Sequence, residues 1–522
     1  MKLPNHVSGK WVEGSGEGVP LIDPVTGEEL ARATSDGIDL AAALDYARAK
    51  GGPALRALTF AERGALLRAV ADALTAKRDD YFDIALRNSG NTKVDAAIDI
   101  DGGIGTLKFY ASLAKGLGGA RYLRDPGYER LGKDEAFQAM HLWAPLHGAG
   151  IHINAFNFPS WGMWEKAAVA ILSGVPAFVK PATSTCLLTQ RMVKDVIDAG
   201  ALPDGALSVI CGGGRALLGL TTGQDAVAFT GSADTARALR ANPNVIARST
   251  RVNIEADSLN LSLLGPDAKP GSAEFDLFVK EVTREMTVKA GQKCTAIRRA
   301  LVPAAFADAV TEALSARLAK VVTGNPRNES VRMGPLVNKA QQKMALEGIR
   351  QLAAEADVVV GGGEGFKPVD ADPRAAAFVA PTLLRAKAPK EGRAIHEVEV
   401  FGPVCTVMPY AGKEEAYVLA ARGGGSLAAS VFTGDDAFAT DAALGIAAMH
   451  GRILVIDAKV AEANTGHGIV MPMCVHGGPG RAGGGEELGG KRGMRFYHQR
   501  VAVQANTARL DQLAAGAVEA AL

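Results

Sequence analysis

Apolar runs alternate with amphipathic segments most regularly between residues 149 and 256. The runs "GAGIHIN", "VPAFVK", "LSVICGGG" and "AVAFTGS" are short, apolar and bounded by turn residues, as is typical of buried strands. The segments "PSWGMWEKAAVAILSG", "TSTCLLTQRMVKDVIDAG" and "ADTARALRAN" lie between them and predict helices, and "VIARSTRVNIEA" predicts extended chain. Strands separated by helices of this length predict parallel βαβ units in an open, doubly wound α/β sheet.

Patterns outside this region predict further elements. Thr59 and Glu62 have the spacing of a capping box, and the residues that follow on one helical face are Leu66, Leu67, Val70 and Leu74. The segment "TAIRRA" after Cys294 predicts the start of a helix, and "VEAAL" at the end of the sequence predicts a helical tail. The alternation in "RFYHQRVAVQ" predicts a strand.

The predicted strands end in polar or glycine-rich sequences. These are "NAFNFP", "KPATST", "CGGG" and "FTGS", and ligands of open α/β sheets bind at the carboxyl ends of the strands. The dinucleotide fingerprint G-x-G-x-x-G is absent, and "GGGRALLG" only approximates it. A dinucleotide bound at this edge therefore needs another binding mode.

Composition narrows the classes of protein. The 522 residues suggest two to four domains, and 48% hydrophobic residues indicate a folded protein with a large core. A net charge of +1 argues against nucleic-acid or membrane-surface partners. We expect no signal peptide, because the N-terminal sequence "MKLPNHVSGKWVEGSGEG" has no apolar segment, and no membrane span, because the longest apolar run, "AAVAILSGVPAFV", is too short. Five scattered cysteines predict reduced thiols in the cytoplasm and no metal site.

Cys294 lies in "VKAGQKCTAIRRA", and a cysteine in isolation is usually a small, inert core residue. The order of several motifs changes this interpretation: "NAFNFPSWGMWEKAAVAILSGVPAFVKPA", "FTGSADT", "NIEADSLN", "AGQKCTA", "MGPLVN" and "EVFGPV". Together they resemble the aldehyde dehydrogenase superfamily over nearly the whole chain. The resemblance implies a Rossmann-type cofactor domain, an α/β catalytic domain and a small β oligomerisation ribbon.

The resemblance also implies catalytic residues. Cys294 matches the nucleophile, which attacks the aldehyde and forms a thiohemiacetal that becomes a thioester after hydride loss. Asn157 and the backbone N–H of Cys294 match the oxyanion donors, and Glu255 matches the base that activates water. A turn asparagine and a salt-bridged glutamate at a strand end are the ordinary alternatives for Asn157 and Glu255. As a nucleophile, Cys294 is expected to be an exposed thiol of low pKa.

Seven further positions match family residues that bind the cofactor. They are Lys180 and Thr183 near the adenosine ribose, Phe229, Gly231 and Ser232 in the turn facing the pyrophosphate, and Glu399 and Phe401 at the nicotinamide ribose. A surface lysine and a core phenylalanine are the alternatives for Lys180 and Phe401. NAD-preferring relatives usually carry glutamate at the position of Thr183. A neutral threonine does not repel a 2′-phosphate, so NADP is the expected cofactor.

A narrower resemblance rests on "VHGGPGRAGGGEELGGKRG" and "RFYHQRVAVQ". It points to the aldehyde dehydrogenases that oxidise CoA-thioester semialdehydes in aromatic degradation, which are fused to a hydratase in the phenylacetate pathway and stand alone in benzoyl-CoA oxidation. The implied substrate is 3,4-dehydroadipyl-CoA semialdehyde. The alternatives are a CoA-acylating aldehyde dehydrogenase and a catalytically silent nucleotide-binding protein. Arg481 could meet a CoA phosphate or face solvent, and His476 and His498 receive no role.

The same resemblance divides the chain. Residues 1–121 and 149–257 form the expected cofactor-binding domain, 258–475 the catalytic domain, and 122–148 with 494–506 the oligomerisation ribbon. The ribbon strand suits pairing with a second subunit, so a homodimer is expected.

Overall fold

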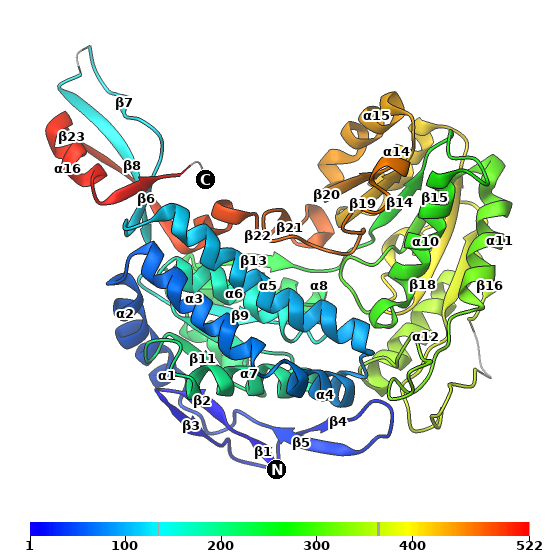
Figure 1. Ribbon diagram of the computed structural model, residues 1–522, viewed down its shortest axis with the longest axis horizontal. Helices are drawn as coiled ribbons and strands as arrows, with labels where there is room; N and C mark the ends of the chain where they lie inside the picture. Colours follow the sequence, from blue (N-terminus) through cyan, green and yellow to red (C-terminus); the bar gives the residue numbers. More distant parts are fainter. Residues whose placement is uncertain (134, 363–365, 521–522) are drawn as a thin grey trace.

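The computed structural model describes residues 1–133, 135–362 and 366–520, and two seven-stranded sheets organise most of them (Figure 1). The first sheet has the order β13-β12-β9-β10-β11-β2-β3. Its parallel strands are β13 (Arg251–Glu255), β12 (Ala226–Thr230), β9 (Gly150–Ile153), β10 (Ala177–Lys180) and β11 (Leu207–Val209), while β2 (Asn5–Val7) and β3 (Lys10–Val12) are antiparallel. The prediction of a parallel α/β sheet is confirmed.

Helices pack on this sheet where the sequence predicts them. They are α6 (Trp161–Leu172), α7 (Cys186–Asp198) and α8 (Ala233–Arg240). The capping box is confirmed at α3 (Phe60–Thr75): Glu62 N–H donates to Thr59 Oγ1 at 3.3 Å, and Thr59 N–H donates to Glu62 Oε2 at 2.7 Å. Leu67, Val70 and Leu74 of α3 are fully buried, whereas Leu66 is half-buried. The buried face packs against α5 (Lys93–Leu117).

One predicted extended segment is partly wrong. The segment "VIARSTRVNIEA" begins inside α9 (Pro243–Arg248), and only its second half forms β13. The side chain of Asn242 accepts the N–H of Asn244 at 3.0 Å, and Pro243 occupies the first helical turn. This cap and the fixed φ of proline start a helix that the apolar pattern alone does not indicate.

The second sheet has the order β16-β17-β18-β15-β14-β19-β20. Its strands are β16 (Ala356–Val360), β17 (Thr382–Ala386), β18 (Val404–Tyr410), β15 (Arg299–Pro303), β14 (Leu261–Leu264), β19 (Ser426–Phe432) and β20 (His450–Ile456), of which β16 is antiparallel to its neighbour. The helix expected directly after Cys294 is wrong, because the segment "TAIRRA" leads without helix into the central strand β15, which begins at Arg299. Arg299 is buried and donates to Leu259 O at 3.1 Å and Leu419 O at 2.7 Å, so it serves the core and not a solvent-facing helix.

A smaller sheet projects from the molecule as an arm (Figure 1). It contains β6 (Tyr122–Arg124), β7 (Glu129–Arg130), β8 (Phe137–Pro145), β23 (His498–Asn506) and β24 (Ala517–Glu519). Strand β23 pairs with β8 along its nine residues. The helical tail expected in "VEAAL" is wrong, because 517–519 pair in parallel with β6; residues 521 and 522 lie outside the described residues.

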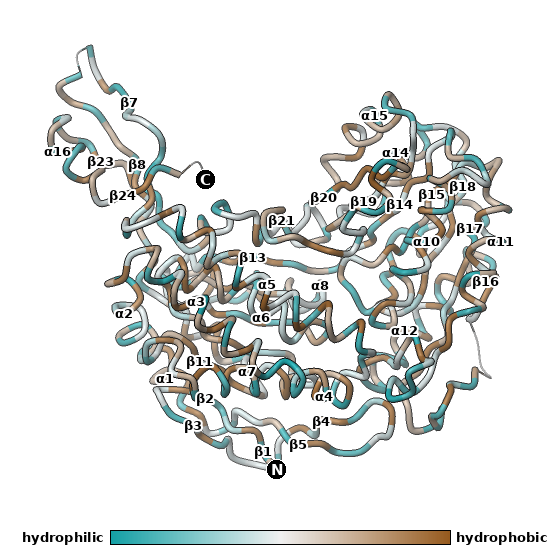
Figure 2. The backbone as a smooth tube through the Cα atoms, in the orientation of Figure 1, coloured by the Kyte–Doolittle hydropathy of each residue, from teal (hydrophilic) through white to brown (hydrophobic). Residues whose placement is uncertain are grey.

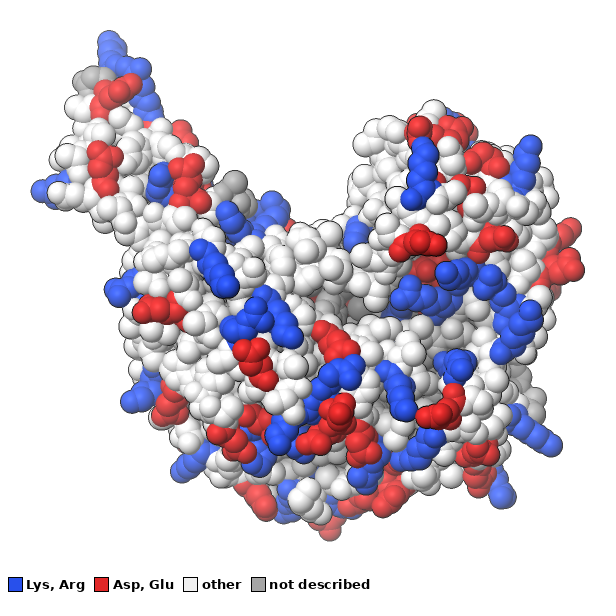
Figure 3. Space-filling model, in the orientation of Figure 1, with Lys and Arg blue, Asp and Glu red and all other residues white. Residues whose placement is uncertain are grey.

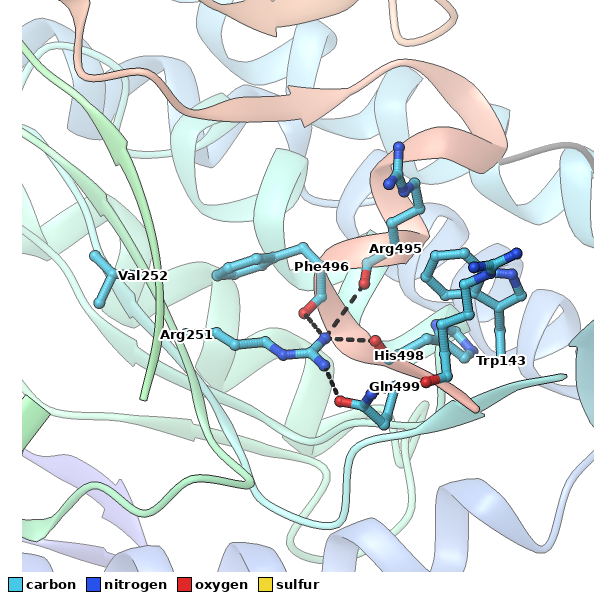
Figure 4. Close-up of a pocket in the computed structure, with 8 residues that line it drawn as sticks. Trp143, Arg251, Val252, Arg495, Phe496, His498 and Gln499 are labelled. Atoms are coloured by element: carbon cyan, nitrogen blue, oxygen red, sulfur yellow. Dashed lines mark hydrogen bonds between the residues drawn. The ribbon is translucent and has the colours of Figure 1, made fainter. Parts of the chain in front are cut away.

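Arg251 of β13 ties the base of the arm to the first sheet (Figure 4). Its guanidinium donates to the backbone carbonyls of Phe496, at 3.3 Å, and of His498, and to the side chain of Gln499. An open pocket of about 500 Å³ beside this contact is lined by Trp143, among others. The strand that ends in Glu255 therefore also anchors the arm.

Hydropathy and charge follow this architecture. The strands of the second sheet are predominantly hydrophobic (Figure 2), and β14, β15 and β19 are completely buried. Acidic and basic side chains are interspersed on the face in Figure 3, and a broad hollow separates the arm from the part that carries α15 (Asp436–Ile446). None of the described helices is long and apolar enough to cross a bilayer.

Candidate active site

The loop that carries Cys294 is held in an uncommon backbone conformation. Lys289 and Ala290 both have φ of 52°, in the left-handed backbone region that residues other than glycine rarely adopt. Gly291 follows with φ of 69°, and a Cβ there would lie 2.2 Å from the carbonyl oxygen of Gly402. Only glycine permits this approach, which explains the glycine-led turn ahead of the thiol.

Three motifs from distant parts of the chain meet at this loop. Arg298 donates to Gly291 O at 2.7 Å and to Gly402 O at 2.6 Å, and Gly402 belongs to "EVFGPV". Asn260 of "NIEADSLN" donates to Cys294 O at 2.7 Å. Val337 of "MGPLVN" donates its N–H to the side chain of Gln292 at 3.0 Å. The motifs therefore share a physical task, which is to hold the thiol loop.

Cys294, Glu255 and Asn157 line one small pocket. Glu255 is the last residue of β13, and Asn157 lies in the loop between β9 and α6. Asp99 of α5 fixes that loop by accepting the N–H of Trp161 at 2.8 Å. Within the described chain, neither the Asn157 side chain nor the Cys294 N–H makes an intramolecular hydrogen bond. Both donors are therefore free to bind an oxyanion in the pocket.

Glu255 has a close partner that the sequence analysis missed. His476, on β21 (Val475–Gly477), places its Nε2 2.7 Å from Glu255 Oε2, and its ring lies edge-on to Trp161 at 5.1 Å. Burial alone would raise the pKa of Glu255, but His476 and Lys166 outweigh it and hold that pKa below its usual range. Glu255 is therefore ionised at neutral pH and able to accept a proton. No local motif marks His476; its role depends on β21 lying beside β13.

Cys294 does not have the low pKa that the sequence analysis expects. Burial and the negative charge of Glu255 raise the pKa of the Cys294 thiol well above its usual value. The side chain is half-buried and not fully exposed. The thiol is thus protonated at rest, beside a carboxylate that can take its proton.

A buried lysine lies behind Glu255. Lys166 Nζ is 2.7 Å from Glu165 Oε1 and 3.0 Å from Glu487 Oε2, and all three side chains are almost completely buried. Glu487 lies on β22 (Glu486–Leu488), directly opposite His476 of β21. Burial raises the pKa of Glu165 to about 8, against the opposing charge of Lys166. Glu165 therefore holds a proton over much of the neutral pH range.

The residues expected to bind the adenosine half of a cofactor lie at the carboxyl ends of β10 and β12. Lys180 ends β10, and a Cβ at Gly214 would lie 3.0 Å from Lys180 Cγ. Thr183 Oγ1 makes a long hydrogen bond of 3.5 Å to Gly212 O. Exposed Ser232 caps α8 by accepting the N–H of Thr235 at 3.3 Å.

Phe229 and Gly231 shape the turn that begins α8. Phe229 is buried, and a Cβ on Gly231 would meet its ring at 2.5 Å. The structure thus gives Phe229 a packing position beneath Gly231. The N–H of Ala233 donates to Asp257 Oδ1 at 3.0 Å, so this helix start already attracts a negative group.

Glu399 and Phe401 reach the site from the second sheet. The Phe401 ring lies edge-on to Phe156 at 5.6 Å, next to Asn157, and the Arg298 guanidinium lies 5.6 Å from the same ring. Burial raises the pKa of Glu399 to about 7, while Arg298 opposes the shift. The first and second sheets therefore contribute to one site.

The residues present fit a nicotinamide dinucleotide. Asn154 and Thr230 line the Cys294 pocket, and the buried oxygen and nitrogen atoms of their side chains have no hydrogen-bond partner in the described chain. Buried polar groups are normally paired, so these atoms suit a polar ligand. Lys180 and the exposed start of α8 provide the positive potential that a pyrophosphate needs.

A second pocket reaches Cys294 from the other side. It is lined by Cys294 itself and by Ile98, Gly102, Phe158, Trp161, Thr295, Gly468, Ile469, Val470 and His476. Its volume of about 60 Å³ is far below the roughly 300–1,000 Å³ of pockets that enclose a drug-sized ligand. The pocket therefore has room for a small group beside Cys294 and not for a whole large ligand.

The other cysteines, Arg481 and His498 lie elsewhere or have other partners. Cys186, Cys211 and Cys405 are buried, whereas Cys474 is exposed. Arg481 donates to the carbonyls of His396, at 3.3 Å, and Glu397, at 2.9 Å, so it is committed to the protein. His498 is buried and contacts Met494 O at 2.8 Å at the base of the arm.

Replacement of Glu255 by Gln should make Cys294 more reactive towards iodoacetamide. The nearby charge of Glu255 raises the thiol pKa, so the variant has more thiolate at any pH below that pKa. The pH profile of alkylation, followed by mass spectrometry of the Cys294 peptide, should shift to lower pH. Labelling of exposed Cys474 serves as the control and should not change. A profile shifted to higher pH would contradict this electrostatic account.

Comparison with known proteins identifies the family. The model of the aldehyde dehydrogenase family matches residues 11–503. A 3,4-dehydroadipyl-CoA semialdehyde dehydrogenase from Aromatoleum evansii is 58% identical over 479 residues, which are 92% of this chain and 93% of that protein. Protein MaoC from Klebsiella aerogenes is 46% identical over 179 residues, 34% of this chain and 52% of that protein.

Solved structures agree on the fold. Betaine aldehyde dehydrogenase from Staphylococcus aureus, in complex with NAD+, has a TM-score of 0.83 at 24% identity and covers 97% of this chain and 98% of its own. PnpE in complex with nicotinamide adenine dinucleotide has a TM-score of 0.84 at 24% identity, with the same coverage. The chain belongs to the aldehyde dehydrogenase family, whose enzymes use a nicotinamide dinucleotide.

Proposed function

We propose that this enzyme oxidises a CoA-linked semialdehyde to the carboxylic acid with NADP+, through a thiohemiacetal and a thioester on Cys294. The observation that carries the proposal is the shared pocket of Cys294, Glu255 and Asn157. The proposed substrate is 3,4-dehydroadipyl-CoA semialdehyde, named in the relative that is 58% identical. Residues 1–121 and 149–257 are proposed to bind the cofactor, 258–475 to carry catalysis, and 122–148 with 494–506 to join subunits.

In the first half of the reaction, Glu255 takes the proton of the Cys294 thiol as the sulfur attacks the aldehyde carbon. The new oxyanion accepts hydrogen bonds from the Asn157 amide and the Cys294 N–H, which have no other acceptor in the described chain. A nicotinamide held at this site would supply the hydride acceptor that conversion of the thiohemiacetal to the thioester requires. The thiol, the base and the oxyanion donors thus all serve the reaction at one carbonyl group.

In the second half, water must cleave the thioester. Glu255 has to lose the proton that it took before it can activate this water. Its surroundings favour that loss, because His476 and Lys166 stabilise the ionised carboxylate. Glu165 lines the same pocket and is already protonated near neutral pH. It is therefore a neighbouring group with which Glu255 can exchange a proton.

Replacement of Glu255 by Gln tests the division of labour. Loss of the Glu255 charge lowers the thiol pKa, so hydride transfer should survive while hydrolysis fails. Rapid mixing should show a burst of NADPH near one equivalent per active site, followed by little turnover. Cys294→Ala, the matched control, should bind NADP+ but give no burst. Loss of the burst in Glu255→Gln would show that the first step cannot proceed without Glu255, and wild-type turnover that depends on free CoA would favour the CoA-acylating alternative.

The small volume of the pocket beside Cys294 limits how much of the substrate can lie inside it. A pocket of about 60 Å³ admits the aldehyde end and leaves a CoA carrier outside. Contacts with that remote part can lower the barrier at the reacting carbon, and each 1.4 kcal/mol corresponds to about tenfold in rate. The substrate proposal therefore requires binding energy outside the pocket.

A CoA-thioester semialdehyde should accordingly have a kcat/KM at least about tenfold above that of a short free aldehyde. Steady-state NADPH formation with both substrates measures the ratio. Added free CoA should inhibit the thioester reaction competitively and have a smaller effect on the short aldehyde. Equal kcat/KM values would indicate a generalist aldehyde dehydrogenase.

The preference for NADP+ rests on the groups around Thr183. A neutral hydroxyl at this position does not repel a 2′-phosphate, which carries nearly two negative charges at pH 7. Half-buried Lys180 is nearby, and exposed Arg215 directly follows Gly214, the residue that packs on Lys180. Burial lowers the pKa of Lys180, so an added phosphate would stabilise its charged form.

Thr183→Glu should therefore shift the preference towards NAD+, mainly through a higher KM for NADP+. Thr183→Ser retains the hydroxyl and serves as the control. The ratio of kcat/KM for the two cofactors, with one aldehyde held saturating, is the measurement. A wild-type kcat/KM for NADP+ that is equal to or below the kcat/KM for NAD+ would overturn the NADP+ assignment.

The arm supports the proposed homodimer. Strand β23 pairs on one side with β8 and ends the path of its sheet, so its other edge is open to a partner strand. Three exposed apolar side chains lie on described strands of the arm: Tyr122, Phe137 and Val501. Such a surface on a projecting element is typical of a subunit interface. The scattered free thiols support a reducing, cytoplasmic location.

Light scattering should give the mass of two chains for the wild type. Val501→Glu places a charge on the outer strand of the arm and should weaken the dimer. Val94→Glu alters an even more exposed valine on α5, away from the arm, and should leave the mass unchanged. A monomeric wild type, or equal effects of the two substitutions, would remove the arm from the proposal.

A further inference from the structure

Three atoms of metal-ligand type converge beside the thiol pocket. Cys294 Sγ, His476 Nε2 and a carboxylate oxygen of Glu255 all lie within 4.8 Å of one another. They come from the Cys294 loop, β21 and the end of β13, so the fold and not a local motif assembles them. Glu255 and His476 are buried, and Cys294 is half-buried.

Two of these groups are poorly satisfied by the protein. His476 Nε2 approaches Glu255 Oε2 to 2.7 Å, yet the contact lacks the alignment of a hydrogen bond. Within the described chain, neither Glu255 oxygen nor His476 Nε2 has a well-aligned hydrogen-bond partner. Buried atoms of this kind usually have a partner, so an atom that binds all three groups would satisfy them.

The surrounding charge also favours a cation. Glu165 and Glu487 lie behind Glu255, and their carboxylate oxygens form a second close group with it. Because Glu165 holds a proton, the negative charge here comes from Glu255 and Glu487, and Lys166 offsets part of it through a contact of 3.0 Å to Glu487. A thiolate at Cys294 would add a further negative charge, which a dication next to the sulfur would balance.

We propose that Cys294, His476 and Glu255 form a binding site for a thiophilic divalent cation such as Zn²⁺, which reversibly blocks the nucleophile. Zinc binds cysteine sulfur at about 2.3 Å, histidine nitrogen at about 2.0–2.1 Å and carboxylate oxygen at about 2.0–2.2 Å. Three such ligands leave the fourth tetrahedral position for water. The pocket that contains both Cys294 and His476 provides space for that water.

Binding changes the chemistry of the sulfur in a defined way. The S–H bond of Cys294 breaks and its proton leaves to the buffer, while the sulfur electron pair forms the bond to zinc. His476 contributes the lone pair of its neutral ring, and Glu255 contributes one carboxylate oxygen. The same electron pair can no longer attack an aldehyde, and the base is held by the metal. Binding rests on geometry alone, whereas inhibition also rests on the proposed role of Cys294.

The ligand types select a soft cation over a hard one. Thiolate and imidazole suit zinc, whereas magnesium and calcium prefer sites made entirely of oxygen. The neighbouring group of Glu165, Glu255 and Glu487 offers oxygen ligands, but the Lys166 ammonium already contacts two of them. Zinc should therefore bind at the thiol side, and magnesium should not compete with it.

Metal binding can be measured without turnover. Enzyme freed of metal with a chelator is titrated with Zn²⁺ by calorimetry and with Co²⁺ by absorption spectroscopy. We expect one Zn²⁺ per chain with a Kd of about 1 µM or tighter. Bound Co²⁺ should show a thiolate charge-transfer band in the near ultraviolet, absent from Cys294→Ala. Saturating Mg²⁺ should change neither result.

Variants separate this site from adventitious thiol binding. His476→Phe keeps an aromatic ring against Trp161 and removes the ligand, and His476→Gln is a second variant in case the first does not fold. Each should weaken Zn²⁺ binding at least about tenfold, the range seen when groups that support a metal site are lost. Cys474→Ser removes the exposed cysteine and should bind normally. Unchanged affinity in both His476 variants, loss of binding in Cys474→Ser, or no binding to the wild type would overturn the proposal.

An activity measurement keeps the two proposals distinct. Zn²⁺ should inhibit oxidation of any aldehyde that the enzyme accepts, and excess chelator should restore the rate. Absence of binding would remove the metal site and leave the proposed function intact. Stoichiometric binding at Cys294 without inhibition would instead contradict the role of Cys294 as nucleophile.

Discussion

The site depends on one buried cation, the guanidinium of Arg298. It donates to Gly291 O at 2.7 Å, to Gly402 O at 2.6 Å and to Lys293 O at 3.2 Å, so one side chain ties the left-handed turn before Cys294 to the Phe401 segment. Burial lowers the pKa of Arg298, which shows the cost of removing this charge from water. The three carbonyls offset that cost, and each would lose a partner without Arg298. A buried polar group left unpaired costs about 1–3 kcal/mol.

Much of the first sheet could be predicted, because its strands and helices follow local rules. The runs that became β9, β10, β11 and β12 are apolar and end at turn residues, and α3 carries its capping box in the sequence. The failures have different physical origins. Arg298 and Arg299 resemble a solvent-facing helix until their carbonyl acceptors are known, and those acceptors lie up to 121 residues away. The strand at 517–519 exists because β6, almost 400 residues earlier, is its partner.

The candidate site shows the same division. Cys294, Glu255 and Asn157 stand in recognisable motifs, and the structure brings all three to one pocket. His476 had no such signal, because its contact with Glu255 is made between segments more than 200 residues apart. The pKa of Cys294 could not be judged from sequence either. An exposed nucleophile suggests a low pKa, whereas burial and the charge of Glu255 raise it.

A protonated thiol beside an ionised base is consistent with the proposed chemistry. A stable thiolate would be open to oxidation between turnovers, since susceptibility follows thiolate character and exposure. With the charge kept on Glu255 instead, the sulfur becomes nucleophilic only as its proton moves. The network around Lys166 keeps that arrangement possible in a buried site, because its cation and His476 stabilise the carboxylate while Glu165 holds a proton. The position of the negative charge, on oxygen at rest and on sulfur during attack, thus links the buried network to the reaction at Cys294.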